Sequence, residues 1–224
     1  MYAPPDAPTA NAELWAHIRH ALPFEAPEEL TVSGDRWQDW EHPELLFSQA
    51  CGLPVADRLR GKVHLVASPD FGLAGCKPGY YHSTVVTRAG ESPAEGMALA
   101  YNSAESQSGW GAAQGLGFVP ALASGAHVAS MAAVAAGRAD VALIDTHTLR
   151  LHGLPEGLAT HGTTPPTPAP PFITAYPDFV EPLRQALAKA IRQASAARAL
   201  GLEGIMPLPL ALYEALPVPP PPAP

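Results

Sequence analysis

The sequence predicts an α/β protein in which strands and helices alternate. Short apolar runs of the kind that form buried strands occur at 63–67, 80–90 and 97–101. A helical pattern at about 125–137 is followed by another apolar run at 141–144. Because strand, helix and strand follow one another, we expect parallel strands joined by right-handed crossovers.

The composition is that of a globular protein with an acidic balance. Hydrophobic residues make up 47% of the 224 residues, charged residues make up 15%, and the net charge is −8. The 13 basic residues form no cluster, which argues against binding to nucleic acid or to an acidic membrane surface. No apolar run of roughly 18 residues exists, so we expect no membrane insertion. Any bound anion must therefore be held mainly by neutral donors.

The first residues and the cysteines bear on the compartment. The opening stretch MYAPPDAPTANAELW has neither the basic region nor the apolar region of a signal peptide. As it reads, the chain is expected to be cytoplasmic, and it would be periplasmic if its N-terminus is truncated. Cys51 and Cys76 could form one disulfide bridge or remain free thiols.

The two ends of the chain have distinct patterns. Apolar spacing predicts a helix at 12–22 and a long amphipathic helix at 178–200. The proline-rich span 163–174 is too stiff for a flexible linker and is interpreted as an extended crossing between two lobes. The final residues LPVPPPPAP form a polyproline tail that we expect to be disordered or loosely packed.

The stretch AYNSAESQSGWGA, residues 100–112, gathers small polar side chains directly after a predicted strand. A helix starting within 106–117 would direct backbone N–H groups and its positive dipole end at this edge of the sheet. The hydroxyls of Ser106 and Ser108 and the amide of Gln107 could then hold an oxyanion. An ordinary helix cap is the commoner explanation for one such residue, but a cap needs only one.

Polar residues also stand at the ends of other predicted strands and helices. In open α/β sheets, ligands bind beyond the carboxyl ends of the strands. Ser83 lies near one such end, and Asp145 follows the strand at 141–144. Asp145 could cap the next helix or accept a hydrogen bond from a protonated ligand. His127, at a predicted helix start, could be a surface residue or a neutral donor into a cleft.

No motif in the sequence indicates a metal, a cofactor or a nucleophile. The nine histidines are scattered, without HxH or HExxH spacing, so a zinc site is rejected. Cys51 with His42 or His82 could be imagined as a thiol nucleophile, but nothing fixes a base or an oxyanion hole for it. GxSxG, P-loop and GxGxxG motifs are missing. The sequence therefore indicates recognition without a cofactor rather than catalysis.

Several segments together resemble a known family. They are PELLFSQACGLPV, PGYYHSTVVTRAG, LAYNSAESQSGWGA, SGAHVASMAAVAAGRADVALID and GTTPPTPAPPFIT, in this order. The chain resembles the phosphate/phosphonate-type ABC-transporter substrate-binding proteins, especially leaderless relatives, over roughly residues 40–200. Two parts of the resemblance are specific. The first is the Ser-x-Ser-Gly junction. The second is a run in which Gly-x-His is followed by Gly-x-x-Asp-x-Ala and then by a single Asp.

The resemblance implies a type 2 periplasmic-binding-protein fold. This fold has two α/β lobes with mixed, mostly parallel sheets, joined by two crossing strands. Lobe one would comprise residues 1–94 and 171–224, lobe two would comprise 95–170, and the ligand would lie in the cleft between them. Family members usually begin with a strand that ends in a Met-Tyr pair. Only Met1 and Tyr2 are left here, so that strand is missing or the start is misplaced.

The resemblance also implies roles for individual residues. Ser106, Gln107 and Ser108 would match the residues that hold phosphonate oxygens. His127 would match the family's histidine on the second helix, and Asp145 the acidic residue after the next strand. Two further positions, Gln49 and Tyr81, match cleft-facing sites of lobe one more loosely.

These observations give one main hypothesis and two alternatives. The main one is a monomeric, non-enzymatic protein that closes over phosphate or an organophosphonate, with an ABC permease as its partner. One alternative is an enzyme or a sensor on the same fold, the enzyme using Cys51 or His127 as its reactive group. The other is a non-phosphorus metabolite stacked on Tyr80, Tyr81 or Trp110.

Overall fold

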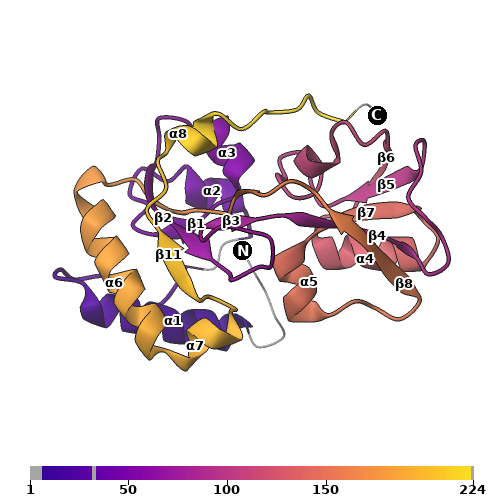
Figure 1. The fold of residues 1–224 in the computed structure, drawn as a ribbon. Helices are drawn as coiled ribbons and strands as arrows, with labels where there is room; N and C mark the ends of the chain where they lie inside the picture. The colour runs from indigo at the N-terminus through magenta and orange to yellow at the C-terminus, as the bar shows by residue number, and fades with distance from the viewer. Residues whose placement is uncertain (1–6, 32–33, 223–224) are drawn as a thin grey trace. The chain divides into compact units, whose positions relative to one another are not determined.

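The computed structural model describes residues 7–31 and 34–222, which form two compact units (Figure 1). Unit 1 lies within Met1–Tyr80 and Pro168–Ala215, and unit 2 within Tyr81–Thr167 and Leu216–Pro224. The expected strand remnant at Met1 and Tyr2 lies outside the described residues.

The sheet of unit 2 places its strands in the order β6-β5-β7-β4-β8. Strand β5 pairs in parallel with β6 and β7, which confirms the parallel unit that the sequence predicts. Strand β4 pairs antiparallel with β7 and β8, so the sheet is mixed. The bounds are β4 Ser83–Arg88, β5 Ala98–Tyr101, β6 Val119–Ala123, β7 Val141–Asp145 and β8 Leu158–Thr163.

The boundary of unit 2 differs from the expected one at residue 95. Strand β4 belongs to unit 2 because it pairs with β7 from Ser83 opposite Asp145 to Thr87 opposite Val141. The tail after Ala215 also belongs to unit 2. The residues of β4 show a strand pattern, but a pattern does not identify the partner strand.

The two faces of this sheet are packed by alternate residues of the central strands. Ala100, Ala142 and Ile144 pack with the buried face of α4, the helix His127–Ala135. Leu99, Val141 and Leu143 pack on the other face with Trp110. Because successive strand residues point to opposite faces, these apolar runs are buried on both sides.

Unit 1 contains an antiparallel sheet in the order β1-β10-β2-β11 and several packed helices (Figure 1). Its strands are β1 Ser48–Gln49, β2 His64–Asp70, β10 Phe172–Thr174 and β11 Gly204–Met206. Its helices are α1 Ala7–Ala21, α2 Arg36–Trp40, α3 Gly52–Ala56, the short 3₁₀-helix η2 Pro177–Phe179, α6 Val180–Gln193, α7 Ser195–Ala199 and α8 Ala211–Glu214. The helix predicted at 12–22 is confirmed and begins earlier.

The long helix predicted at 178–200 is interrupted. Ala194 has an extended backbone with ψ of 131°, which separates α6 from α7. The carboxylate of Glu13 in α1 accepts hydrogen bonds from Ser195 Oγ at 2.7 Å and from the N–H of Ala196 at 3.2 Å. These contacts satisfy donors at the start of α7, as a cap does, and the periodicity of the helix cannot reveal them.

The chain passes between the units inside two short paired strands. These are β3 (Tyr80–Tyr81) and β9 (Thr167–Pro168), which form a two-stranded sheet. The second of them lies in the proline-rich span that the sequence marks as a crossing.

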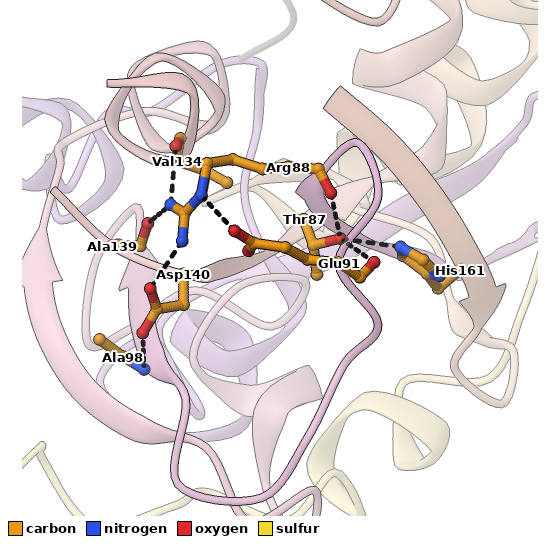
Figure 2. A network of polar contacts seen from close by, with 8 residues as sticks. All are labelled: Thr87, Arg88, Glu91, Ala98, Val134, Ala139, Asp140 and His161. Carbon is orange, nitrogen blue, oxygen red and sulfur yellow. Dashed lines mark hydrogen bonds and ion pairs between the residues drawn. The ribbon is translucent and has the colours of Figure 1, made fainter. Parts of the chain in front are cut away.

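A polar network holds the sheet end of unit 2 at which β7 begins (Figure 2). The guanidinium of Arg88 donates to the carbonyls of Ala139 at 2.7 Å and Val134 at 3.2 Å. It also donates to Glu91 Oε1 at 2.8 Å and to Asp140 Oδ1 at 2.9 Å. One side chain thus joins the end of β4, the last turn of α4 and the start of β7.

Asp140 extends this network to the neighbouring strand, since its Oδ2 accepts a hydrogen bond from the N–H of Ala98 at 3.0 Å. The hydrogen bond from Arg88 lowers the pKa of the Asp140 carboxyl below its ordinary value. Beside it, Thr87 Oγ1 contacts His161 Nε2 at 2.8 Å (Figure 2).

The structure also bears on the disulfide bridge that the sequence allows and on the expected absence of a membrane-spanning helix. Cys51 and Cys76 form no disulfide bridge in the structure, and burial raises the pKa of the Cys76 thiol. Among the described residues, no helix combines the length and apolar character that crossing a membrane requires.

Candidate functional site

The candidate site lies at the edge of the unit 2 sheet at which β5 and β7 end and β4 begins. Ser83 stands opposite Asp145 in the register of β4 and β7. The buried hydroxyl of Ser83 donates to the backbone oxygen of Ser108 at 2.8 Å. This contact joins the first residue of β4 to the polar loop that follows β5.

That loop does not form the helix predicted within 106–117. Residues 107–110 form turns, and only the short 3₁₀-helix η1, Gly111–Ala113, follows. Glycines at 115 and 117 adopt φ of 78° and 73°, which an α-helix cannot accommodate. The buried Ser106 Oγ accepts from the N–H of Gly109 at 2.9 Å, so it acts as a local cap within the turn.

The loop is joined to α4 by Ser108 and His127. Ser108 Oγ lies 2.9 Å from His127 Nε2. His127 is the first residue of α4, and the preceding Ala126 supplies no side-chain cap to the helix. The first turn of α4 therefore begins beside a buried hydroxyl and a neutral imidazole, with backbone N–H groups that no side chain caps.

Burial lowers the pKa of His127 to about 4, and the carbonyl of Leu143 opposes this shift. An unfolded histidine has a pKa of about 6.5, so between these values the unfolded chain binds more protons. This contribution to stability is complete above about pH 6.5 and is lost as the pH falls toward 4. The ring is therefore neutral at pH 7.

We expect His127→Gln to lose less stability than the wild type on acidification, because the variant has no imidazole to protonate. The difference between the two losses should be about 2–3 kcal/mol between pH 7 and pH 4. Urea unfolding of both proteins at pH 7, 5.5 and 4 measures it. Equal losses would show that His127 is not buried as described.

Asp145 is almost wholly buried and caps α5, the helix Thr146–His152. Its Oδ1 accepts from the N–H groups of His147 at 2.8 Å and Thr148 at 3.2 Å. This is the capping role that the sequence left open for it. A direct contact of Asp145 with a ligand stays a prediction.

The remaining predicted residues lie in different places. Gln107 is buried, and its Nε2 donates to Thr167 Oγ1 at 2.8 Å. Tyr81, in β3, is 1% exposed and belongs to unit 2. Gln49 lies in β1 of unit 1, where its Nε2 donates to the backbone oxygen of Pro170 at 3.0 Å. Unit 2 alone thus gathers Ser83, Ser106, Ser108, His127 and Asp145 at one edge.

The structure adds residues at this edge that the sequence did not single out. His82 Nδ1 lies 2.9 Å from Thr146 Oγ1, and Thr84 Oγ1 lies 2.7 Å from the same hydroxyl. Their positions in the sequence could have indicated them, because His82 and Thr84 flank Ser83 and Thr146 follows Asp145. Nothing in the sequence shows that β4 and β7 are partners.

Asn102, the residue after β5, is a further addition. Its Oδ1 is buried and makes no hydrogen bond with the described residues. A Cβ built on Gly109 would lie 2.0 Å from that oxygen, so a larger residue here would require the Asn102 side chain or the loop to shift. A buried polar atom without a partner is uncommon in native proteins and often marks a functional position.

No site for a metal ion is apparent in residues 7–31 and 34–222. These residues contain no group of three or more His, Cys, Asp or Glu side chains that could hold one. The donors at the edge are hydroxyls, amides and a neutral imidazole, which suit a hydrogen-bonded anion better than a cation.

No protein-family model matches the sequence, and no curated protein matches it significantly. Solved structures do resemble it. The protein XAC2383 from Xanthomonas citri, bound to a chloride ion, has 18% identity and a TM-score of 0.67, covering 94% of this chain and 93% of that chain. PhnD1 from Prochlorococcus marinus, in complex with methylphosphonate, has 15% identity and a TM-score of 0.70, covering 93% and 90%.

A third similar structure is the binding-protein component of an ABC phosphonate transporter from Pseudomonas aeruginosa. It has 12% identity and a TM-score of 0.61, and the match covers 88% of this chain and 76% of that chain. At such identities the likeness concerns the fold. The chain has the two-lobed type 2 periplasmic-binding-protein fold.

Proposed function

We propose that the protein is a solute-binding protein that holds a small tetrahedral oxyanion, such as phosphate or an organophosphonate. The observation that carries the proposal is the contact of Ser108 with His127 at the uncapped start of α4. A helix N-terminus offers backbone N–H groups and a positive dipole end to an anion. The similarity to PhnD1, solved with methylphosphonate, supports this choice of ligand.

The hydroxyls near α4 can donate without adding charge. Ser106 Oγ accepts from the N–H of Gly109, so its own proton is available to a ligand. Ser108 can donate its hydroxyl proton to a ligand if His127 Nε2 carries the ring proton. The Nε2–H group then donates a hydrogen bond to Ser108 Oγ. The proposal therefore requires the Nε2–H form of a neutral His127, which its pKa of about 4 permits at neutral pH.

Binding fits the Ser108–His127 pair better than catalysis does. A serine hydrogen-bonded to histidine is also the arrangement of a nucleophile and its base. A base with a pKa of about 4 takes up a proton poorly near pH 7. Among the described residues, no carboxylate hydrogen-bonds to His127 Nδ1, so none orients the ring.

A stacked aromatic metabolite is less well supported than an anion. Trp110 is 8% exposed and packs in the core with Leu99 and Leu143, and Tyr81 is 1% exposed. In the structure, with the C-terminal tail in place, neither ring leaves an exposed face on which a metabolite could stack. The anion proposal therefore rests on the polar residues. We further propose that the two lobes close over the anion and that the protein delivers it to an ABC permease.

Titration calorimetry with phosphate, phosphite, methylphosphonate and sulfate tests the proposal. We expect one of the phosphorus oxyanions to bind, and Ser108→Ala to weaken it by about 10- to 100-fold, as a lost hydrogen bond to a charged group predicts. Ser103→Ala, in the same loop, is the matched control and should change affinity less than about twofold. The proposal fails if none of the four anions binds, or if the two variants behave alike.

A further inference from the structure

The C-terminal tail, residues 216–222, packs in unit 2, although the sequence predicts a disordered or loosely packed end. The indole Nε1 of Trp110 donates to the backbone oxygen of Pro220 at 2.8 Å. Trp110 follows the polar loop of the candidate site, two positions after Ser108. The tail is therefore joined to the segment that carries the candidate ligand donors.

The exposure of the tail repeats every three residues. Leu216, Pro219 and Pro222 are half-buried, whereas positions 217, 218, 220 and 221 are exposed. A polyproline II helix has about three residues per turn, so residues three apart share one face. The pattern indicates that the tail is a polyproline II segment with one face against unit 2.

The indole that bonds to the tail belongs to an aromatic pair, and aromatic side chains are the usual docking partners of such segments. The rings of Tyr101 and Trp110 lie 5.6 Å apart and are inclined by 48°. Polyproline ligands dock on aromatic side chains, and they present carbonyl oxygens that have no partner within their own helix. The hydrogen bond from the indole to Pro220 supplies that partner.

We propose that Tyr101 and Trp110 form a polyproline-recognition site whose ligand is this chain's own tail. The docked tail acts as a strap on the loop 102–110, because Trp110 anchors the end of that loop. The docked tail is continuous with unit 1 through the backbone, because the chain leaves that unit after Ala215. This inference does not depend on the anion proposed above.

Two physical reasons favour docking in cis. Prolines fix φ before binding, so the tail loses little conformational entropy when it docks. The site and its ligand belong to one chain, which raises the local concentration of the ligand to roughly millimolar. Even a weak contact is then occupied for most of the time.

Exchange of the tryptophan indole protons with solvent tests the register of the strap. In the full-length protein labelled with ¹⁵N-tryptophan, Trp110→Phe identifies the Trp110 signal. We expect Pro219→Ala with Pro222→Ala, on the half-buried face, to accelerate its exchange about tenfold or more. Pro217→Ala with Pro221→Ala removes two exposed prolines and should change it less than about twofold.

Two other indoles are internal controls for folding. Trp15 donates to the backbone oxygen of Pro27 at 3.0 Å, and Trp40 to that of Gln49 at 3.2 Å. Their exchange rates should not change in either tail variant. The proposal is overturned if both variants accelerate Trp110 equally or if neither does, and general unfolding would show as faster exchange at all three indoles.

A second measurement observes the tail itself. Trp110→Phe keeps an aromatic ring in the core but removes the N–H donor together with one ring of the indole. We expect the ¹⁵N heteronuclear NOE of Val218, a tail residue that retains an amide proton, to fall toward values for flexible chains. An unchanged NOE at Val218 would show that the tail is held without Trp110 and would overturn the proposed site. The anion titration decides separately whether unit 2 binds phosphate.

Discussion

Gly109→Ala is expected to weaken binding of the proposed anion more than tenfold and to destabilise the fold by about 1–3 kcal/mol, as overpacking does. The added Cβ would lie 2.0 Å from Asn102 Oδ1 and 3.1 Å from Ser106 Oγ. The same serine oxygen accepts the N–H of Gly109. Relief of the clash requires the Asn102 side chain to turn away or the loop that carries Ser106 and Ser108 to move.

A double-mutant cycle with Asn102→Ala identifies the clash as the cause. Removing the amide removes the atom that the new Cβ would meet first, so Asn102→Ala with Gly109→Ala should be more stable than additivity of the single changes predicts. Chemical unfolding gives the stabilities and calorimetry gives the affinities. If Gly109→Ala is within about 0.5 kcal/mol of the wild type, the close approach has no energetic role.

Arg88→Met is expected to destabilise the protein by about 2 kcal/mol, since it leaves carbonyls and a carboxylate without their charged donor. The side chain is partly exposed, and solvent moderates the loss. The carbonyl of Val134 lies in the last turn of α4, whose first residue is His127. Loosening one end of this helix should therefore also weaken anion binding at the other end.

The controls for this prediction separate geometry from charge. Arg88→Lys keeps the charge but cannot reach two carbonyls and two carboxylates at once, so it should recover only part of the stability. Arg60→Met removes an exposed arginine whose ion pair with Glu214 spans 3.7 Å, and it should cost less than about 0.5 kcal/mol. Urea unfolding of the three variants measures these differences. Equal losses of stability in Arg88→Met and Arg60→Met would contradict the proposal that the Arg88 hydrogen bonds to β4, α4 and β7 stabilise unit 2.

The network also predicts a pH dependence. Arg88 lowers the pKa of Asp140 in the folded protein. This stabilisation is present above the pKa of an unfolded aspartate, about 3.9, and is lost as the pH falls through the lower folded value. We expect the stability difference between the wild type and Arg88→Met to shrink below about pH 4.

Much of the fold could be predicted because periodicity is a local property. The apolar runs that become β2, β5 and β7 stand out in the sequence, as does the helical spacing of α1 and α4. Pairing is not local. The position of β4 between β7 and β8 depends on hydrogen bonds to residues far along the chain, and the unit boundary depends on the same pairing.

For the candidate site, the sequence grouped residues that lie together in unit 2, but it predicted the wrong local structure for the loop after β5. Ser83 at the start of β4, Ser108 in the loop after β5 and His127 at the start of α4 are joined by hydrogen bonds at one edge of the sheet. The helix expected within 106–117 is replaced by turns and the short η1, and glycines 115 and 117 adopt the positive φ that these turns need. The buried amide of Asn102 could not be anticipated, since its burial depends on how closely Gly109 approaches.

The division of the chain has a consequence for synthesis on the ribosome. Every strand of the unit 2 sheet lies between Ser83 and Thr163, so the whole sheet is available before the later segment of unit 1 has been made. In unit 1, β2 must wait for β10 and β11, which come from residues 172–206. We therefore expect the sheet of unit 2 to fold first. Unit 1 would follow once its second segment, after residue 167, has been made, and the proline tail would dock last.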